Sequence, residues 1–297
     1  MELVAHLPDK LLFAVPKKGR LYERAIQLLE GADIQFRRGN RLDIAISTNM
    51  PVALVFLPAA DIPRFVGEGR CSLGITGIDQ VAESKMNVED HLDLNFGKCA
   101  LQVQVPEKGD IDDVKQLIGK NIVTSFTSLT TEFFTKLEGK QPGEKLETNI
   151  KYVGGSVEAA VALGVADAIV DLVESGETMR AAGLKPIETV LTTSAHLIGS
   201  NTPTYPDVAK TIINRISGVL AASKYVLCTY NAPRSALDSL LKITPGRQAA
   251  TVSPLEIEGW VAVSSMVEKK RVAEVMDSLT DAGAIDILVF QLSNCRV

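Results

Sequence analysis

The feature that most constrains the fold of this chain is an alternation of short β-rich runs with helical stretches, which continues to about residue 200. Runs such as Leu11–Val15, Val52–Phe56 and Ala168–Val173 are rich in apolar and β-branched residues, as buried strands are. Stretches between them, such as Leu21–Gly31, carry apolar residues at helical spacing. This alternation predicts an α/β body built on mainly parallel sheets.

The pattern changes after about residue 205. Asp207–Ser223 carries the apolar stripe of one long amphipathic helix. From Tyr225 onward the expected elements follow in the order strand, helix, strand, strand, helix, strand, which is the ferredoxin-like βαββαβ arrangement. The sheet of such a module has one face without helices, and we expect that face to serve oligomer contact or small-ligand binding.

The composition excludes several classes of protein. The 297 residues are enough for two or three domains, and 46% hydrophobic with 23% charged residues is typical of globular chains. A net charge of −5 gives no overall basic field, so neither nucleic acid nor a membrane surface is expected as a partner. The N-terminus lacks the pattern of a signal peptide, and no run approaches the roughly 20 apolar residues of a membrane span. We therefore expect a cytoplasmic protein.

The cysteines and histidines are scattered. The four cysteines form no CxxC pair, which predicts reduced thiols rather than a disulfide framework. The three isolated histidines argue against a zinc site, and no Ser–His–Asp or Cys–His constellation is expected. The sequence thus favours positioning and electrostatics over a covalent nucleophile.

The segment with the most chemical content is Asp171–Thr178, with the sequence Asp-Leu-Val-Glu-Ser-Gly-Glu-Thr. A predicted strand ends in a carboxylate, and a Ser-Gly turn then opens a helix. Backbone N–H groups and hydroxyls such as that of Ser175 suit a dianionic phosphate, and Gly176 permits its close approach. Asp171 and Glu174 can accept hydrogen bonds from sugar hydroxyls. An ordinary N-capping serine explains the same pattern equally well.

Other polar segments are less specific. Pro16–Leu21 places two lysines and an arginine around a glycine at the carboxyl end of a strand, which suits a polyphosphate. A second basic patch, Arg37–Arg41, is either a further clamp or a solvated surface loop, as charge runs usually are. Gly74–Asp79 and Gly154–Glu158 each combine a glycine turn, a hydroxyl and a carboxylate, and neither is informative alone.

With these segments in view, the chain resembles the ATP phosphoribosyltransferases, which catalyse the first step of histidine biosynthesis. Glu158–Met179 fits the family pattern over 22 residues, with the Glu, Gly, Asp, Ser-Gly and Thr-Met positions in place. The likeness extends through Ile243–Gly246 and Trp260–Val263 to Cys295–Val297 and points to the long, self-regulated form.

The resemblance implies a two-lobed, periplasmic-binding-protein-like catalytic body with its active site in the cleft, followed by a regulatory ferredoxin-like domain. Residues 1–95 and 185–222 are expected to form the first lobe with a linking helix, residues 96–184 the second lobe, and residues 223–297 the regulatory domain. It also implies a pentosyl-transferring enzyme that uses ATP and phosphoribosyl pyrophosphate (PRPP). Mg²⁺ would be carried mainly by the substrate phosphates, and the protein would be a homohexamer of dimer units inhibited by histidine.

Site residues follow from the matching segments. The catalytic candidates are Asp171, Glu174 and Glu158. The residues implied for PRPP are Asp171, Glu174, Ser175, Gly176, Glu177 and Thr178; those for ATP are Lys18, Gly19, Arg20, Arg41 and Asp79; those for histidine are Asn231, Thr251 and Ala284. The alternative from another class is a non-catalytic two-lobed small-molecule-binding protein. The missing export signal, the Asp171–Thr178 loop and the extra module argue against it.

Overall fold

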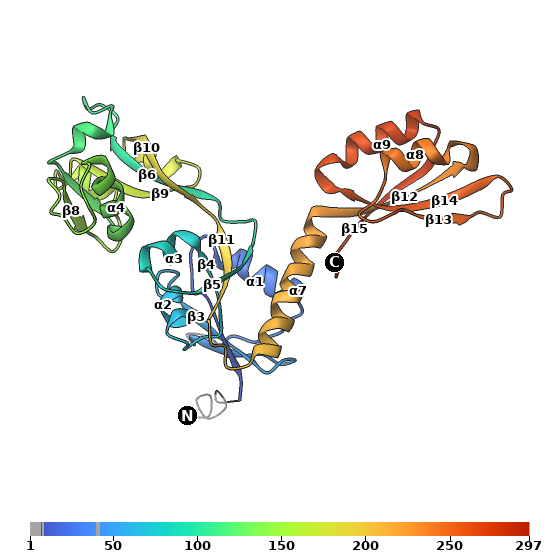
Figure 1. Cartoon of the computed structure of the whole chain (residues 1–297), viewed down its shortest axis with the longest axis horizontal. Helices are drawn as coiled ribbons and strands as arrows, with labels where there is room; N and C mark the ends of the chain where they lie inside the picture. The colour runs from blue at the N-terminus through green and yellow to red at the C-terminus, as the bar shows by residue number, and fades with distance from the viewer. Residues whose placement is uncertain (1–6, 8, 40–41, 297) are drawn as a thin grey trace. The chain divides into compact units, whose positions relative to one another are not determined.

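The computed structural model describes residues 7, 9–39 and 42–296 and contains two compact units (Figure 1). The described residues of 1–26 and 35–209 form the first unit, and those of 27–34 and 210–297 form the second. The first unit is a two-lobed α/β body, as expected from the sequence. In the described ranges, no helix is long and apolar enough to cross a membrane.

The first lobe is built on a six-stranded sheet with strand order β2-β3-β1-β4-β11-β5. Its central strands are buried, and Phe13 and Ile75 have no exposed surface. The strands are β1 (Leu11–Pro16), β2 (Ile44–Ile46), β3 (Val52–Leu57), β4 (Leu73–Gly77), β5 (Glu89–Asp93) and β11 (Ala195–Gly199), and the helices are α1 (Tyr22–Gly31), α2 (Ile62–Gly67) and α3 (Ile78–Ser84).

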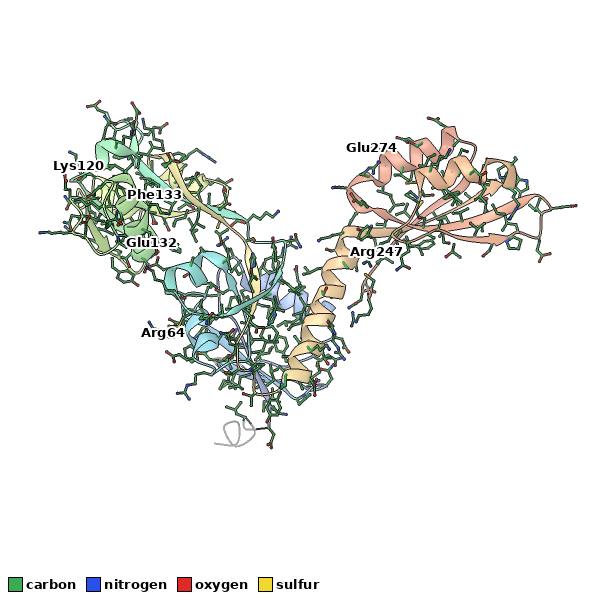
Figure 2. All side chains as sticks on the ribbon, viewed as in Figure 1. Arg64, Lys120, Glu132, Phe133, Arg247 and Glu274 are labelled. Carbon is green, nitrogen blue, oxygen red and sulfur yellow. The ribbon has the colours of Figure 1, made fainter. Side chains whose placement is uncertain are left out.

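The second lobe is built on a five-stranded sheet with strand order β10-β6-β9-β7-β8. Figure 2 shows its side chains, with Glu132 and Phe133 labelled on α4. The strands are β6 (Cys99–Pro106), β7 (Asn121–Thr124), β8 (Asn149–Tyr152), β9 (Ala168–Val173) and β10 (Leu184–Thr193), and the helices are η2 (Val114–Leu117), α4 (Thr127–Leu137), α5 (Ala159–Ala162) and α6 (Glu177–Ala181).

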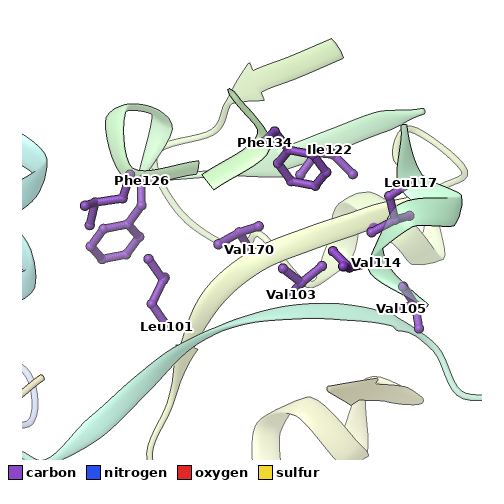
Figure 3. Close-up of a cluster of buried hydrophobic side chains, with 11 residues drawn as sticks. Leu101, Val103, Val105, Val114, Leu117, Ile122, Phe126, Phe134 and Val170 are labelled. Atoms are coloured by element: carbon purple, nitrogen blue, oxygen red, sulfur yellow. The ribbon is translucent and has the colours of Figure 1, made fainter. Parts of the chain in front are cut away.

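One buried cluster in this lobe lies between its sheet and α4 (Figure 3), and another includes residues of α5 and α6. Leu101 and Val103 of β6 and Val170 of β9 are fully buried, and they pack with Phe126 and Phe134 around the helix. Burying a side chain of this size contributes roughly 1.5–3 kcal/mol. The packed layer holds the carboxyl end of β9 firmly, and this is where the polar loop of the site begins.

Both sheets of the body are mixed, so the expectation of mainly parallel sheets was wrong. β1 is parallel to β3 and β4, but β2, β5 and β11 join that sheet through antiparallel pairs. In the second sheet β7 is parallel to β8 and β9, whereas β6 and β10 pair antiparallel. The physical reason is that β5 leads into β6, and β10 into β11, as extended chain that passes between the lobes without a crossover helix.

β10 changes the expected boundary between the lobes. Residues 185–193 were assigned to the first lobe from the sequence, but β10 pairs with β6 in the second sheet. The strand lies at the sheet edge, contains Pro186 and has register shifts around Glu188 and Thr189. An edge strand with half-exposed residues lacks the apolar run by which the buried strands were found.

The second unit contains α7 (Pro206–Lys224) from residue 210 onward and the C-terminal module. The module's strands are β12 (Tyr225–Pro233), β13 (Thr251–Pro254), β14 (Trp260–Glu268) and β15 (Ile285–Gln291), and its helices are η3 (Arg234–Ala236), α8 (Leu237–Ile243), η4 (Lys269–Arg271) and α9 (Val272–Asp281). Their antiparallel order β13-β14-β12-β15 confirms the ferredoxin-like βαββαβ arrangement.

The sheet of the module has one covered and one open face. α8 and α9 lie on the same side of it (Figure 1). Residues of β12 and β14 alternate between buried and half-exposed, and buried Val226 and Tyr230 belong to the core. On the opposite face Leu227 is paired with Phe290, whose side chain is exposed. This face is the one without helices that the sequence predicted.

Candidate active site

A cavity of about 280 Å³ lies at the end of β9. Most of its wall is the loop predicted to bind a phosphorylated sugar. Its lining residues are Arg20, Cys99, Gln104, Glu158, Asp171, Leu172, Val173, Glu174, Ser175, Gly176, Glu177, Thr178 and Met179. The structure thus brings together all six residues of the predicted PRPP loop, Glu158 from the segment before α5, and Arg20 from the first lobe.

Asp171 and Glu158 form the acidic part of this cavity. Burial raises the pKa of Asp171, and the negative charge of Glu158 raises it further. The backbone N–H of Leu172 donates a 2.8 Å hydrogen bond to Asp171 Oδ1 and opposes that rise. Because burial and a neighbouring negative charge make the ionised form of Asp171 unfavourable, its carboxylate binds hydroxyl donors or developing positive charge more strongly than an exposed carboxylate does.

The loop between β9 and α6 turns at Gly176, which has a φ of 75°. Only glycine adopts this left-handed conformation without strain. A Cβ on Gly176 would also lie 2.7 Å from Nη1 of Arg180. The same guanidinium donates from Nη2 to the Ser175 carbonyl at 3.1 Å, so Arg180 braces the loop. The sequence reading missed Arg180, because it sits inside α6 and outside the expected motif.

The hydroxyl of Ser175 caps the start of α6 only weakly. Its Oγ lies 3.4 Å from the backbone nitrogen of Glu177, near the limit for a hydrogen bond. The residue at the N-cap of α6 is Gly176, which has no side chain to cap the helix. The alternative of an ordinary serine cap therefore accounts for little of the loop's geometry.

The basic segment after β1 contributes one group to the cavity. Arg20 Nη1 donates a 2.6 Å hydrogen bond to the carbonyl of Gly97, which orients the guanidinium. Lys18 and Gly19 are exposed on the same turn, where Gly19 has a φ of 85°. Arg41, predicted to contact ATP, lies outside the described residues.

In the second basic patch, Arg38 has a structural position. Its guanidinium lies 3.9 Å from the ring centre of Phe56 and 3.5 Å from a carboxylate oxygen of Asp43. A hydrogen bond from Lys17 lowers the pKa of Asp43, as do the charges of Lys17 and Arg38. Arg38 is therefore held against Phe56 and Asp43, with its side chain 23% exposed, and is not a fully solvated loop residue.

Asp79 lies behind the wall of the site. It is fully buried, and its Oδ1 accepts a 2.6 Å hydrogen bond from Thr193 Oγ1. The Asp79 backbone N–H donates to the same hydroxyl, and Gln80 Nε2 donates to Oδ2. These bonds tie α3 to the end of β10, so Asp79 supports the site and does not line either of its cavities.

A second cavity, of about 660 Å³, adjoins the first where β6 and β9 meet the segment between β10 and β11. The two cavities share Cys99, Val173 and Glu174. The other lining residues are Ile78, Lys98, Ala100, Gln102, Thr192, Thr193, Ser194 and His196. The site therefore extends from the loop of the second lobe to the strands that join the lobes.

Hydrogen bonds link a histidine to a serine and an aspartate at the edge of the second cavity. His196 Nδ1 lies 2.8 Å from Asp90 Oδ1, and His196 Nε2 lies 3.1 Å from Ser194 Oγ. This corrects the expectation that no Ser–His–Asp constellation is present. Pairing of β5 with β11 unites residues about a hundred positions apart, which the local sequence could not reveal.

The three residues predicted for histidine binding do not line one cavity. Asn231 and Thr251 are on the open face of the module, on strands separated by β14, and Nδ2 of Asn231 donates to Asp286. Ala284 is buried in the module core. Strand spacing puts Asn231 and Thr251 roughly 10 Å apart or more.

No group of three or more histidine, cysteine, aspartate or glutamate side chains is arranged to hold a metal ion within the described parts of the chain.

The fold and the site define a class: a two-lobed α/β body with a polar loop lining its cavity, followed by a ferredoxin-like module. The ATP phosphoribosyltransferase family model matches residues 58–218, and the model described as HisG, C-terminal domain, matches residues 222–294. The chain belongs to the ATP phosphoribosyltransferase family.

Individual relatives agree along the whole chain. The ATP phosphoribosyltransferase of Yarrowia lipolytica is 72% identical over 297 residues, and that of Saccharomyces cerevisiae is 60% identical over 298 residues. Both comparisons cover 100% of each chain. Among solved structures, the ATP phosphoribosyl transferase (HisG:HisZ) complex from Thermotoga maritima matches with a TM-score of 0.59 at 20% identity, covering 70% of this chain and 96% of that one. This last match supports the fold.

Proposed function

We infer that this chain is an ATP phosphoribosyltransferase, a pentosyl-transferring enzyme. It moves the phosphoribosyl group of PRPP to N1 of ATP, releases pyrophosphate and so begins histidine biosynthesis. The 60–72% sequence identity over the full length of two proteins of that name supports this inference. The structural observation that carries the inference is the cavity at the end of β9, where one loop supplies carboxylates, hydroxyls and backbone amides.

We propose that the Asp171–Thr178 loop holds PRPP. The hydroxyls of Ser175 and Thr178, with backbone N–H groups of the turn, suit the 5′-phosphate, and Gly176 lets that phosphate approach the backbone. Asp171 and Glu174 would accept hydrogen bonds from the ribose hydroxyls. Glu177 completes the loop, and Glu158 would add its charge from the facing segment.

On the ATP side we propose Lys18, Gly19 and Arg20, together with Arg41, with Asp79 as a support behind the wall. Arg20 lines the same cavity as the PRPP loop, and Lys18 is exposed beside it. Guanidinium and ammonium groups pair well with phosphate oxygens. The second cavity, which shares Cys99 and Glu174 with the first, is where the adenine ring would meet the ribose.

The transfer requires the two substrates to be positioned for direct reaction and does not require a covalent intermediate with the protein. The lone pair of adenine N1 forms a bond to ribose C1′ while the C1′–O bond breaks and its electron pair leaves with pyrophosphate. The ribose carries positive charge as that bond breaks. Asp171, Glu174 and Glu158 would stabilise this charge, which makes them the catalytic candidates.

Mg²⁺ fits this site as a companion of the substrates. Asp171, Glu174 and Glu158 line the cavity. Burial raises the pKa of Asp171 and the charge of Glu158 adds to that rise, so a cation bound between these carboxylates would be favoured. Mg²⁺ is commonly bound by one or two carboxylates plus substrate phosphates. Bound in this way, it would neutralise charge on the leaving pyrophosphate.

We further propose that the C-terminal module binds histidine as a feedback inhibitor and that the protein is a homohexamer of dimer units. The exposed apolar side chains of Leu288 and Phe290 on the open sheet face favour contact with another copy. Asn231 and Thr251 lie on the same face. A bulky change, Thr251→Trp, should weaken histidine inhibition while leaving uninhibited turnover nearly intact. Equal inhibition of variant and wild type would leave only an assembly role for the module.

We also propose a cytoplasmic location, supported by the four free cysteines. Burial raises the pKa of Cys71 to about 12, so this thiol stays protonated and inert at neutral pH.

The direct test of the function is to mix the protein with ATP, PRPP and Mg²⁺ and to follow both phosphoribosyl-ATP absorbance and pyrophosphate release. Product formation that needs both substrates is expected. No product, with tight binding of an unrelated solute, would favour the non-catalytic binding protein.

A further inference from the structure

The hydrogen-bonded group at the second cavity contains a histidine, a serine hydroxyl and two aspartates, of which one contacts the histidine and the other the serine. His196 lies near the start of β11, and its side chain is 14% exposed. Asp90 holds Nδ1 from β5, while Nε2 faces Ser194 Oγ. Asp93 Oδ1 lies 3.2 Å from the same hydroxyl, so the Ser194 proton has two acceptors. An aspartate on Nδ1 fixes the tautomer that leaves Nε2 free to accept a proton.

This group lies where the second substrate would react. Ser194 and His196 line the cavity that also contains Glu174 of the PRPP loop. An adenine ring in that cavity would have the ribose on one side and the Ser194–His196 pair on the other. With adenine bound there, the Ser194–His196 pair would be a proton acceptor on the nucleobase side, whereas the loop that we assign to the 5′-phosphate lines the first cavity.

The transfer reaction releases a proton from the adenine ring system, and a base must accept that proton. When adenine N1 becomes bonded to ribose C1′, the ring gains a positive charge, and the 6-amino group beside N1 becomes acidic. Loss of one amino proton gives a neutral 6-imino product. A base of pKa near neutrality is best matched to this transfer.

We propose that His196, acting through Ser194, accepts the proton that the 6-amino group of ATP loses during phosphoribosyl transfer. The amino proton goes to Ser194 Oγ, and the hydroxyl's own proton goes to His196 Nε2. Asp90 stabilises the imidazolium that results. This inference rests on the proposed function.

Other charged groups near the cavity are less suited to the task. Lys98 is cationic at neutral pH, and Glu174 belongs to the loop assigned to the ribose. Burial raises the pKa of Cys99, so its thiol is a poor base at neutral pH. Asp90 and Asp93 face the imidazole and the hydroxyl as partners. Among these groups, the imidazole of His196 already has a carboxylate on Nδ1 and a hydroxyl at Nε2, which is the geometry that a proton acceptor requires.

The test compares pH profiles of kcat for wild type and His196→Gln, measured by product absorbance at saturating ATP and PRPP. For wild type, kcat should fall at acidic pH as the imidazole becomes protonated. His196→Gln should lower kcat by roughly 100-fold, at the lower end of what general-base catalysis contributes, and should remove the acidic limb. His91→Gln is the matched control: His91 lies on β5 but lines neither cavity, so its profile should equal that of wild type.

Two outcomes would overturn the proposal. One is an unchanged kcat in His196→Gln, and the other is a uniform loss of rate with the acidic limb still present, as a purely structural role predicts. If His196→Gln does not fold, Ser194→Ala takes its place, with the same expected loss of rate and of the limb. Wild type that makes no product would instead contradict the proposed function itself.

Discussion

Asp171 shows how a single residue in this site combines an energetic cost with a chemical use. Its raised pKa results from burial first and from the charge of Glu158 second. A carboxyl whose pKa is raised by folding favours the folded state while protonated. That contribution is present below the ordinary pKa of 3.8 and is lost as the pH rises through the higher folded-state value. At neutral pH the ionised Asp171 therefore destabilises the fold.

We predict that Asp171→Asn raises the melting temperature at pH 7 while lowering kcat/KM sharply. The amide oxygen can still accept from the Leu172 N–H, but the buried charge is gone. The gain in melting temperature should shrink as the pH falls through the raised folded-state pKa and disappear below the ordinary value of 3.8, where the carboxyl is protonated in both the folded and the unfolded state. Asp43→Asn is the control of opposite sign, because Lys17 lowers the pKa of that carboxyl. Melting curves at both pH values check this, and a lower melting temperature of Asp171→Asn at pH 7 would contradict it.

Gly176 gives a second prediction at this scale. Gly176→Val should reduce kcat/KM by orders of magnitude, because a Cβ there meets the Arg180 guanidinium and adds bulk to the loop that we propose to bind the phosphate. Gly119→Val is a matched control, since Gly119 also has a left-handed φ, of 82°, but has nothing within 4 Å of its Cβ position. Both variants should lose stability to backbone strain of roughly 1–3 kcal/mol. Steady-state kinetics of the folded proteins distinguishes the catalytic defect of Gly176→Val from the loss of stability that both variants share. Normal turnover of Gly176→Val would show that the loop does not bind PRPP.

Among the elements, the C-terminal end of α4 depends on one carboxylate. Glu138 accepts hydrogen bonds from Lys140 at 2.8 Å and from the backbone N–H groups of Glu147 and Thr148 at 2.8 and 3.0 Å. Burial acts to raise the pKa of Glu138, but these hydrogen bonds outweigh it and hold the pKa at about 2. The carboxylate thus fastens the segment before β8 to the end of the helix.

We predict that Glu138→Gln destabilises the protein by about 2 kcal/mol at neutral pH, since a charge-assisted acceptor of three donors is lost. Because the folded pKa is depressed, this contribution is present above the ordinary value of 4.5 and is lost as the pH falls toward about 2. The stability difference between wild type and variant should therefore narrow in acid. Urea unfolding at pH 7 and pH 3 measures it, and a constant difference would exclude the carboxylate as its cause.

The elements also show what could be predicted from the sequence. β9 was predicted with its observed bounds because its apolar run is local and buried. β5 and β10 were missed, since each lies at a sheet edge and lacks such a run. The residues of the proposed PRPP loop line one cavity, and the sequence could group them because they are contiguous. The Ser194–His196–Asp90 group was not predicted, because strand pairing, which no local pattern encodes, brings its members together.

At the scale of the whole catalytic body, the two lobes are joined by a carboxylate as well as by the connecting strands. The side chain of Glu83, on α3 of the first lobe, accepts from the backbone N–H groups of Ser128 at 2.8 Å and Leu129 at 3.0 Å. These are N–H groups of the first turn of α4, and no side chain at its N-cap residue Phe126 satisfies them. Glu83 thus caps a helix of the other lobe, a position that also favours negative charge.

An ion pair also connects α3 with α4, but unlike the Glu83 hydrogen bonds it is exposed to solvent. Lys85 Nζ lies 2.8 Å from Glu132 Oε1, and both side chains are more than half exposed. Exposed ion pairs of this kind contribute about 0–1 kcal/mol. The two interactions therefore allow a matched comparison of a helix-capping carboxylate with a solvated ion pair at one interface.

We predict that Glu83→Gln speeds amide hydrogen exchange at Ser128 and Leu129 by roughly 5- to 30-fold. This corresponds to losing about 1–2 kcal/mol of charge-assisted hydrogen bonding that holds α4 against α3. Glu132→Gln, which breaks only the exposed pair with Lys85, should change exchange at the same amides less than about 5-fold. High salt should mimic Glu132→Gln but not Glu83→Gln, because screening acts mainly on exposed charges. Equal effects of the two substitutions would mean that the connecting strands alone hold the lobes, and that Glu83 caps α4 without stabilising the contact.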